Sequence, residues 1–210
     1  MNKAIISVYR YQELKGSFKE NAKNEFYNSI DDSSWDDDVR SKFTERMAEM
    51  GFTVDKIYYS IGGGQGDGAM FEGYVSDWSK LLPKLSELTR QRIDSCVKIE
   101  PNFLSMLSWK VEHDRGRYYH ENSGSAECYI DIDENDEVFS DIDSKWDIED
   151  DINDNILTIY KDECRKLYKE LLDEYDKETD DDAIESFYDS EDAWFTSFGE
   201  RVYPIEVLVD

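Results

Sequence analysis

The first candidate for a binding or catalytic site is a glycine-rich stretch, in which five of the seven positions 62–68 are glycine. Backbone amides without neighbouring side chains, together with Gln65 and Asp67, could approach a ligand closely there. Gly64-x-Gly66-x-x-Ala69 matches the looser dinucleotide-binding fingerprint, which requires a helix after the glycines. Residues 69–75 are short, aromatic-rich and interrupted by a glycine, which favours a strand. No Lys-Ser or Lys-Thr pair follows, so a phosphate-binding P-loop is excluded as well.

Two interpretations of this stretch stay open. The glycines either connect two strands with positive φ angles, or they form a binding site. An enzyme built on the second interpretation would be a small hydrolase or nucleotide-binding enzyme using residues 62–68, with Asp67 as base and His120 as acid or ligand. The sequence contains no recognised nucleophile motif, which favours a protein that is not an enzyme. The candidate loop residues are Gln65, Gly66, Asp67, Gly68, Tyr119 and His120.

The only two histidines, His113 and His120, lie on either side of a turn. Two imidazoles could act as acid and base or bind a metal. The alternative is a pair of half-buried, hydrogen-bonded side chains. Tyr118 and Tyr119 precede His120, and this polar-tipped aromatic group would also suit a partner surface.

Acidic residues dominate the composition, with 50 acids against 24 bases and a net charge of −26. Residues 131–195 hold 26 acids and 6 bases, a net charge of −20. Such a segment is either a solubilising face or a set of fixed carboxylates that mimics the nucleic-acid backbone. In the second case, the predicted contacts to a basic protein are Asp147, Glu149, Asp150, Asp151, Asp154, Asp173, Glu174 and Asp176.

No metal or cofactor is expected. The run Asp131, Asp133, Asn135 and Glu137 is similar to a calcium loop. Asp136 stands where the loop requires glycine, and Ile142 stands where it requires glutamate. Cys96, Cys128 and Cys164 are widely spaced and form no Cys-x-x-Cys pair, so neither a disulfide framework nor a zinc site is predicted.

The charge also bears on location and partners. A strongly negative surface repels nucleic acid and anionic membranes and attracts basic proteins. The apolar run near Met1 is too short for a signal peptide, and no stretch approaches the length of a membrane span. We therefore expect a soluble, cytoplasmic protein with a basic protein partner.

Hydrophobic periodicity predicts an α+β fold in a single domain, 1–210, with antiparallel sheet elements, several helices and a strongly acidic C-terminal portion, 131–195. Ser34 is expected to cap a helix that ends at Gly51, and Pro83 to interrupt another, with Leu81, Leu82, Leu85 and Leu88 facing the core. Strands are predicted over 3–11, either side of the glycine loop in 52–75, as a three-stranded meander over 103–132, and over 201–209. Helices are predicted over 17–30, from Ser34 to Gly51, and over 77–93, 151–178 and 183–188.

The string Tyr59-Ser60, four residues, then Gln65-Gly66-Asp67-Gly68-Ala69-x-Phe71 resembles one in small, mostly unannotated proteins of tailed bacteriophages. Two other places are similar to those proteins: Gly116-Arg117-Tyr118-Tyr119-His120 with Ser125, and Ala183-Ile184-Glu185-Ser186 with Trp194-Phe195 and Gly199. The resemblance implies a phage origin, hence the cytoplasm of a host cell, and supplies no activity. Together with the clustered charge it suggests a phage-encoded acidic interaction protein that inhibits a host nucleic-acid-binding or defence protein.

Overall fold

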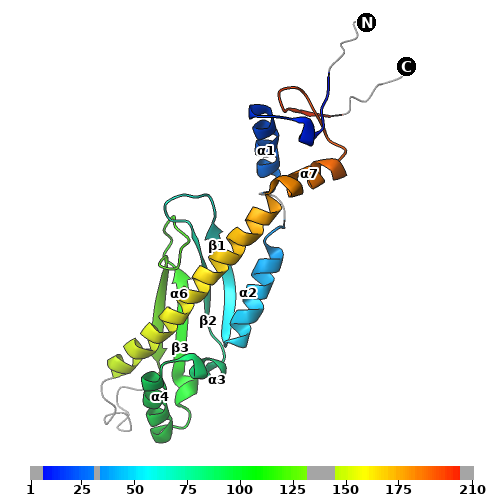
Figure 1. The fold of residues 1–210 in the computed structure, drawn as a ribbon. Coiled ribbons are helices and arrows are strands. Elements are labelled where there is room, and N and C mark those ends of the chain that lie inside the picture. Colours follow the sequence, from blue (N-terminus) through cyan, green and yellow to red (C-terminus); the bar gives the residue numbers. More distant parts are fainter. Residues whose placement is uncertain (1–6, 31–33, 132–144, 204–210) are drawn as a thin grey trace, which may run out of the picture. The chain divides into compact units, whose positions relative to one another are not determined.

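The computed structural model describes residues 7–30, 34–131 and 145–203 (Figure 1). The chain divides into two compact units. The larger unit comprises residues 37–172, and the smaller unit joins residues 1–36 to residues 173–210.

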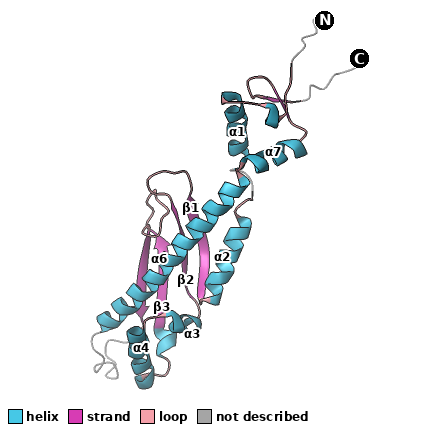
Figure 2. Cartoon of the chain, viewed as in Figure 1, coloured by secondary structure: helices cyan, strands magenta, loops and turns pink. Residues whose placement is uncertain are grey.

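The larger unit is built around one antiparallel sheet with the strand order β1-β2-β3-β4 (Figure 2). Its strands are β1 (Phe52–Ser60), β2 (Gly68–Val75), β3 (Leu107–His113) and β4 (Gly124–Ile130). Its helical elements are α2 (Asp37–Glu49), α3 (Trp78–Leu81), η2 (Leu82–Lys84), α4 (Glu87–Ile99), α5 (Phe103–Met106) and the portion up to residue 172 of α6 (Lys145–Glu178).

One face of this sheet is buried because apolar side chains alternate with polar ones along the strands. In β3, Leu107, Trp109 and Val111 are buried, whereas Ser108, Lys110 and Glu112 are exposed. The ring of Trp109 meets that of Phe52 with centroids 5.8 Å apart. The buried face is therefore the side on which the helices pack.

Helix α6 covers that face (Figure 1). Tyr160 lies at the centre of the contact, with its ring 4.9 Å from that of Phe71. Its hydroxyl donates to the Phe71 carbonyl at 3.2 Å, and Trp109 Nε1 donates to Asn153 Oδ1 at 3.0 Å. Spacing of three to four residues places the buried side chains of α6 in this unit on one stripe: Ile148, Ile152, Ile156, Tyr160, Cys164, Leu167 and Leu171.

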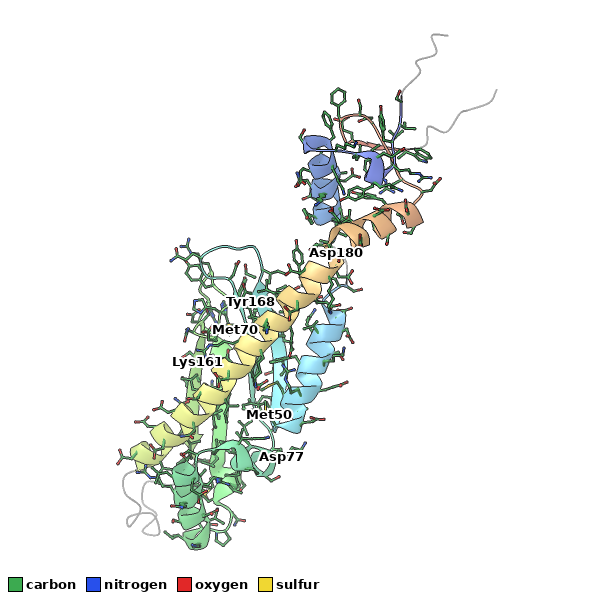
Figure 3. All side chains as sticks on the ribbon, in the orientation of Figure 1. Met50, Met70, Asp77, Lys161, Tyr168 and Asp180 are labelled. Atoms are coloured by element: carbon green, nitrogen blue, oxygen red, sulfur yellow. The ribbon has the colours of Figure 1, made fainter. Side chains whose placement is uncertain are left out.

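A charged contact attaches α2 to α6 beside the apolar one. Arg46 Nε donates to Glu163 at 3.0 Å, and its two terminal nitrogens donate to Glu170 at 2.9 and 3.1 Å. Glu163 is only 5% exposed, so its charge requires these donors. Helix α2 ends before Gly51, which has φ +95° and approaches the Asp77 carbonyl (Met50 and Asp77 are labelled in Figure 3).

The smaller unit has an aromatic core. It contains η1 (Tyr11–Glu13), α1 (Ser17–Ile30), the end of α6, α7 (Asp181–Ser190), β5 (Trp194–Phe195) and β6 (Arg201–Val202). Tyr188 packs on Phe195 at 4.8 Å between ring centroids, and its hydroxyl donates to the Ala22 carbonyl at 2.7 Å. Hydrogen bonds from Lys23 and Lys19 of α1 lower the pKa of Asp181 on α7 to about 2.

The predicted α+β fold with antiparallel sheet elements is confirmed. A single domain over 1–210 stays a prediction. The predicted helices over 17–30, 151–178 and 183–188 are present, although the second begins at Lys145. The interruption at Pro83 is also confirmed, since η2 separates α3 from α4. Among the helices in the described residues, none has the length and apolar character needed to cross a bilayer.

Four local predictions are wrong. Residues 103–132 give only two strands after the short helix α5, because residues 114–123 form a loop instead of a middle strand. Helix α2 begins at Asp37, too far along the chain for Ser34 to cap it. Leu88 is 61% exposed on α4. In the described part of the first predicted strand, only Tyr9 pairs, through a single bridge to Phe195; residues 1–6 lie outside the described residues, as do residues 204–210 of the last predicted strand.

The contact between Arg46 and α6 gives a stability prediction. Arg46→Met keeps the aliphatic part of the side chain but removes the three hydrogen bonds that Arg46 donates to Glu163 and Glu170. We expect the free energy of unfolding to fall by about 1.5–3 kcal/mol, the range for hydrogen bonds to charged groups. Urea denaturation measures the change, with Arg40→Met on the same helix as the control. An equal, small effect of both substitutions would contradict this role for Arg46.

Candidate functional site

The glycine loop between β1 and β2 is organised around Asp67. Its Oδ1 accepts from Ser60 Oγ at 2.8 Å, and its Oδ2 accepts from the backbone N–H groups of Gly62 at 2.8 Å and Gly64 at 2.7 Å. The Gly62 amide, then Ser60, and then the other loop amides favour the charged carboxylate and lower the pKa of Asp67. Asp67 therefore holds the loop closed, and the Gly62 and Gly64 amides are bonded within the loop instead of to a ligand.

The next two glycines of the motif permit close contact with the loop 114–123. A Cβ on Gly66 would lie 2.1 Å from Tyr118 Cδ1, and φ at this position is +99°. A Cβ on Gly68 would lie 2.6 Å from the backbone Cα of His120. Both positions exclude larger residues for packing reasons, so the structure supports the interpretation of the motif as a connection between strands.

A small hollow of about 340 Å³ opens beside these residues, and it contains four of the predicted loop candidates. His120 Nδ1 accepts from the Asn122 amide at 3.1 Å, which leaves Nε2 as the protonated nitrogen of the neutral ring. Acid–base cooperation would need Asp67 as the base, but a carboxylate with a lowered pKa is a weak base. The lining residues are Gln65, Gly66, Asp67, Tyr118, His120, Glu121 and Asn122.

The close packing at Gly66 predicts which glycines tolerate substitution. Gly66→Ala forces a side chain into a positive φ and against Tyr118, so we expect a loss of about 1–3 kcal/mol in unfolding free energy. Gly62→Ala is the matched control, because nothing lies within 4 Å of its added Cβ and its φ is outside the positive region. Thermal unfolding of the two variants compares them. Equal melting temperatures would show that Gly66 is not packed in this way.

The hydrogen bonds of Asp67 predict a pH-dependent contribution to stability. Asp67→Asn can keep an oxygen facing the Gly62 and Gly64 amides with its NH₂ facing Ser60, but it removes the negative charge that these donors stabilise, so we expect a loss of about 1–2 kcal/mol near neutral pH. Because the folded pKa lies below the usual 3.8, this contribution is present above pH ~4 and disappears as pH falls through the folded pKa. Chemical denaturation between pH 7 and pH 2 measures it, with Asp94→Asn as control. A difference between wild type and variant that is constant with pH would contradict the assignment.

Tyr119, the remaining loop candidate apart from Gly68, belongs to a different cluster. Its ring stacks on Tyr58 at 5.6 Å and lies 5.4 Å from His113. Glu72 supports this cluster, since one carboxylate oxygen accepts from Tyr58 Oη at 3.0 Å and the other from the His113 amide at 3.0 Å. His113 Nε2 also lies 3.0 Å from the Tyr118 carbonyl. The two histidines therefore sit in separate environments with their own hydrogen-bond partners.

A second hollow, of about 670 Å³, lies where the sequence did not predict a site. It runs over the polar face of the sheet, opposite the face with the buried side chains. Tyr74 and Tyr129, 44% and 53% exposed, stand beside it, and Ser108 lies between their strands. Its charged lining residues are Asp55, Glu72, Glu112, Glu127, Lys110 and Arg115. The alternation of polar and apolar residues in β3 and β4 was the sequence pattern that could have indicated this polar face.

The predicted acidic contacts differ in their environments. Glu149 is 6% exposed and accepts from the Ile130 amide at 2.7 Å, so it is a structural residue and its assignment to an outer contact surface is wrong. Asp151 pairs with Arg92 of α4. Asp147, Asp150 and Asp154 are exposed and, within the described residues, have no cation in ion-pair distance.

The rest of α6 is not uniformly acidic. Four bases follow in its middle: Lys161, Arg165, Lys166 and Lys169 (Lys161 is labelled in Figure 3). Asp173 and Asp176 are exposed in the smaller unit, and Glu174 pairs with Lys177 at 2.6 Å. Among the predicted acidic contacts, the exposed ones therefore fall in two separate stretches of the helix.

No group of three metal-binding side chains occurs among the residues that the structure describes. Most of the run similar to a calcium loop, from Asp133 to Ile142, lies outside the described residues. Burial raises the pKa of the Cys128 and Cys164 thiols to about 12, which keeps both protonated and unreactive near neutral pH.

A family model described as Domain of unknown function (DUF8835) matches residues 35–181. The match covers well over half of the 210 residues, so the chain belongs to this family. It includes all four strands of the sheet, the glycine loop and the large hollow. No curated protein and no solved structure matches the chain.

Proposed function

We propose that this member of the DUF8835 family is a phage-encoded acidic interaction protein that acts in the host cytoplasm. It binds a basic host protein, of the nucleic-acid-binding or defence class, and inhibits it by occupying the surface that meets the nucleic-acid backbone. The resemblance of the Gln65-Gly66-Asp67-Gly68-Ala69 region to tailed-phage proteins supports the setting. The net charge of −26 supports the choice of a basic partner.

The observation that carries the proposal is the arrangement of carboxylates at the start of α6. Glu149 and Asp151 fix this part of the helix, the first to the Ile130 amide of β4 and the second to Arg92 of α4. Around these two anchored residues, Asp147, Asp150 and Asp154 remain exposed. Charges held on a fixed helix lose less conformational entropy on binding than charges on a flexible tail.

Electrostatic attraction then sets the kinetics of binding. Exposed carboxylates act on the encounter of two proteins over distances near the Debye length, about 8 Å at physiological salt. Association should therefore slow as salt rises, while the intrinsic dissociation of the complex changes less. Phosphate-binding grooves of nucleic-acid-binding proteins are rich in Lys and Arg, so they are the complementary surface.

Charge reversal at α6 tests the proposal. We expect the triple substitution Asp147→Lys/Asp150→Lys/Asp154→Lys to lower the association rate with the basic partner by about tenfold or more at low salt. Folding should be nearly unchanged because exposed charges contribute little to stability. The partner is captured from bacterial lysate on immobilised wild type and identified by mass spectrometry, and its binding rates are then measured against salt.

The control carries the same charge change elsewhere on the larger unit: Glu45→Lys/Glu49→Lys/Asp94→Lys, three exposed positions on α2 and α4. It should keep most of the association rate. Double-stranded DNA should compete with the wild-type protein for the captured partner. The proposal would be overturned by an association rate that changes neither with salt nor with the α6 charge reversal. A partner that binds DNA and this protein at the same time would also overturn it.

A further inference from the structure

We infer that the sheet face opposite α6 in the larger unit is a second binding surface, which takes an extended Arg- or Lys-containing segment of a partner protein. The inference rests on the proposed function for its partner class, and it assigns a separate site from α6. The site is the hollow of about 670 Å³ over β2, β3 and β4.

The register of the strands determines the shape of the site. Tyr74 pairs with Lys110, which pairs with Glu127, so these three side chains form one row across the sheet. Ser108 pairs with Tyr129 in the next row. Serine is small, and both exposed tyrosines stand beside it: Tyr129 lies directly opposite on β4, and Tyr74 lies diagonally across on β2.

The charges of the hollow select a cationic occupant. Four carboxylates line it against two permanent cations. Lys110 Nζ lies 3.2 Å from Glu112 and 3.6 Å from Glu127, so one internal lysine is shared by two carboxylates. These acids raise the pKa of Lys110. Glu72 is already engaged with Tyr58 and the His113 amide, which leaves Glu112, Glu127 and Asp55 to meet a partner.

The exposed tyrosines add a second reason for a guanidinium or ammonium group. A cation over an aromatic face gains attraction from the ring quadrupole. The chain itself uses this contact on Tyr58, where Lys56 Nζ lies 4.4 Å from the ring centroid. Tyr74 and Tyr129, flanked by carboxylates, offer the same combination to a partner.

The net charge of the chain argues against two other occupants of the hollow, a nucleic acid and a second copy of the chain. A nucleic acid would face a chain with 26 excess negative charges, and its phosphates would meet the carboxylates of the hollow. A second copy of the chain would bring together two molecules that each carry a net charge of −26, and their repulsion opposes association at low salt. A cationic protein segment gains from both the local and the total charge.

A peptide with alternating Arg and Ser residues is a suitable probe, because alternate side chains of an extended segment point to the same side. NMR titration of the full chain should move the amide signals of Tyr74, Ser108, Lys110 and Tyr129, and calorimetry should give the affinity. The same peptide with Glu in place of Arg should not bind. Shifts confined to α6 would overturn the assignment of the sheet face.

Substitutions separate this site from general electrostatic attraction. Tyr74→Ala and Tyr129→Ala should each weaken binding about threefold to tenfold, whereas Tyr74→Phe and Tyr129→Phe should bind like wild type. Tyr203→Ala, an exposed tyrosine of the smaller unit, is the control. Lys110→Ala removes the internal competitor for Glu112 and Glu127, so it should tighten binding about twofold to fivefold.

The outcomes distinguish the two proposals. Suppose that the α6 charge reversal abolishes capture of the basic partner, while substitution of Tyr74, Tyr129 or Lys110 leaves the peptide affinity unchanged. The sheet-face inference then fails and the proposed function stands. If the peptide binds as described but capture of a basic partner does not depend on the α6 carboxylates, the proposed function fails and the sheet-face inference stands. Dimerisation of the chain that the two Tyr→Ala substitutions disrupt would show that the occupant is a second copy.

Discussion

The packing of α6 on one face of a single four-stranded sheet is the contact on which the larger unit depends. Tyr160 shows why the contact is specific: its ring fills the space against Phe71 and Trp109, and its buried hydroxyl has a backbone acceptor. A sheet of this size needs only one apolar face to be stable, and burying it leaves the other face polar. The hollow on the polar side, opposite α6, is thus a direct result of how the core is built.

The net charge limits how the remaining residues can be used. With 50 acids and 24 bases, a one-to-one match of charges would leave 26 acids without a base. The structure places bases where charge must be buried or elements joined, as with Arg46 at Glu163 and Arg92 at Asp151. The unmatched carboxylates repel one another, which reduces the stability of the compact state. A cationic partner of the proposed kind would offset that repulsion.

Sequence patterns predicted the elements whose stability is local. The three-to-four spacing from Ile152 to Leu171 identified most of α6, and Gly51 marked the end of α2, because both depend on residues close in the chain. The pattern failed at residues 117–120, where strand-like residues form a loop because Tyr118 packs on Gly66, about fifty positions away. The hollow over β3 was missed for a related reason, since it requires knowledge of which strands are neighbours. Glu149 shows the limit for single residues, because nothing in its neighbourhood along the chain reveals its hydrogen bond to Ile130.

That hydrogen bond also joins the two proposed surfaces. Glu149 lies between the exposed carboxylates Asp147 and Asp150, and it accepts from the amide of Ile130 at the end of β4. On the same strand as Ile130, Tyr129 and Glu127 line the hollow on the sheet face opposite α6. A buried carboxylate keeps its charge only while its donors stay in place, so the start of α6 and the end of β4 must keep a fixed relation. A partner that contacts both surfaces would therefore meet one preformed arrangement, which lowers the entropy lost on binding.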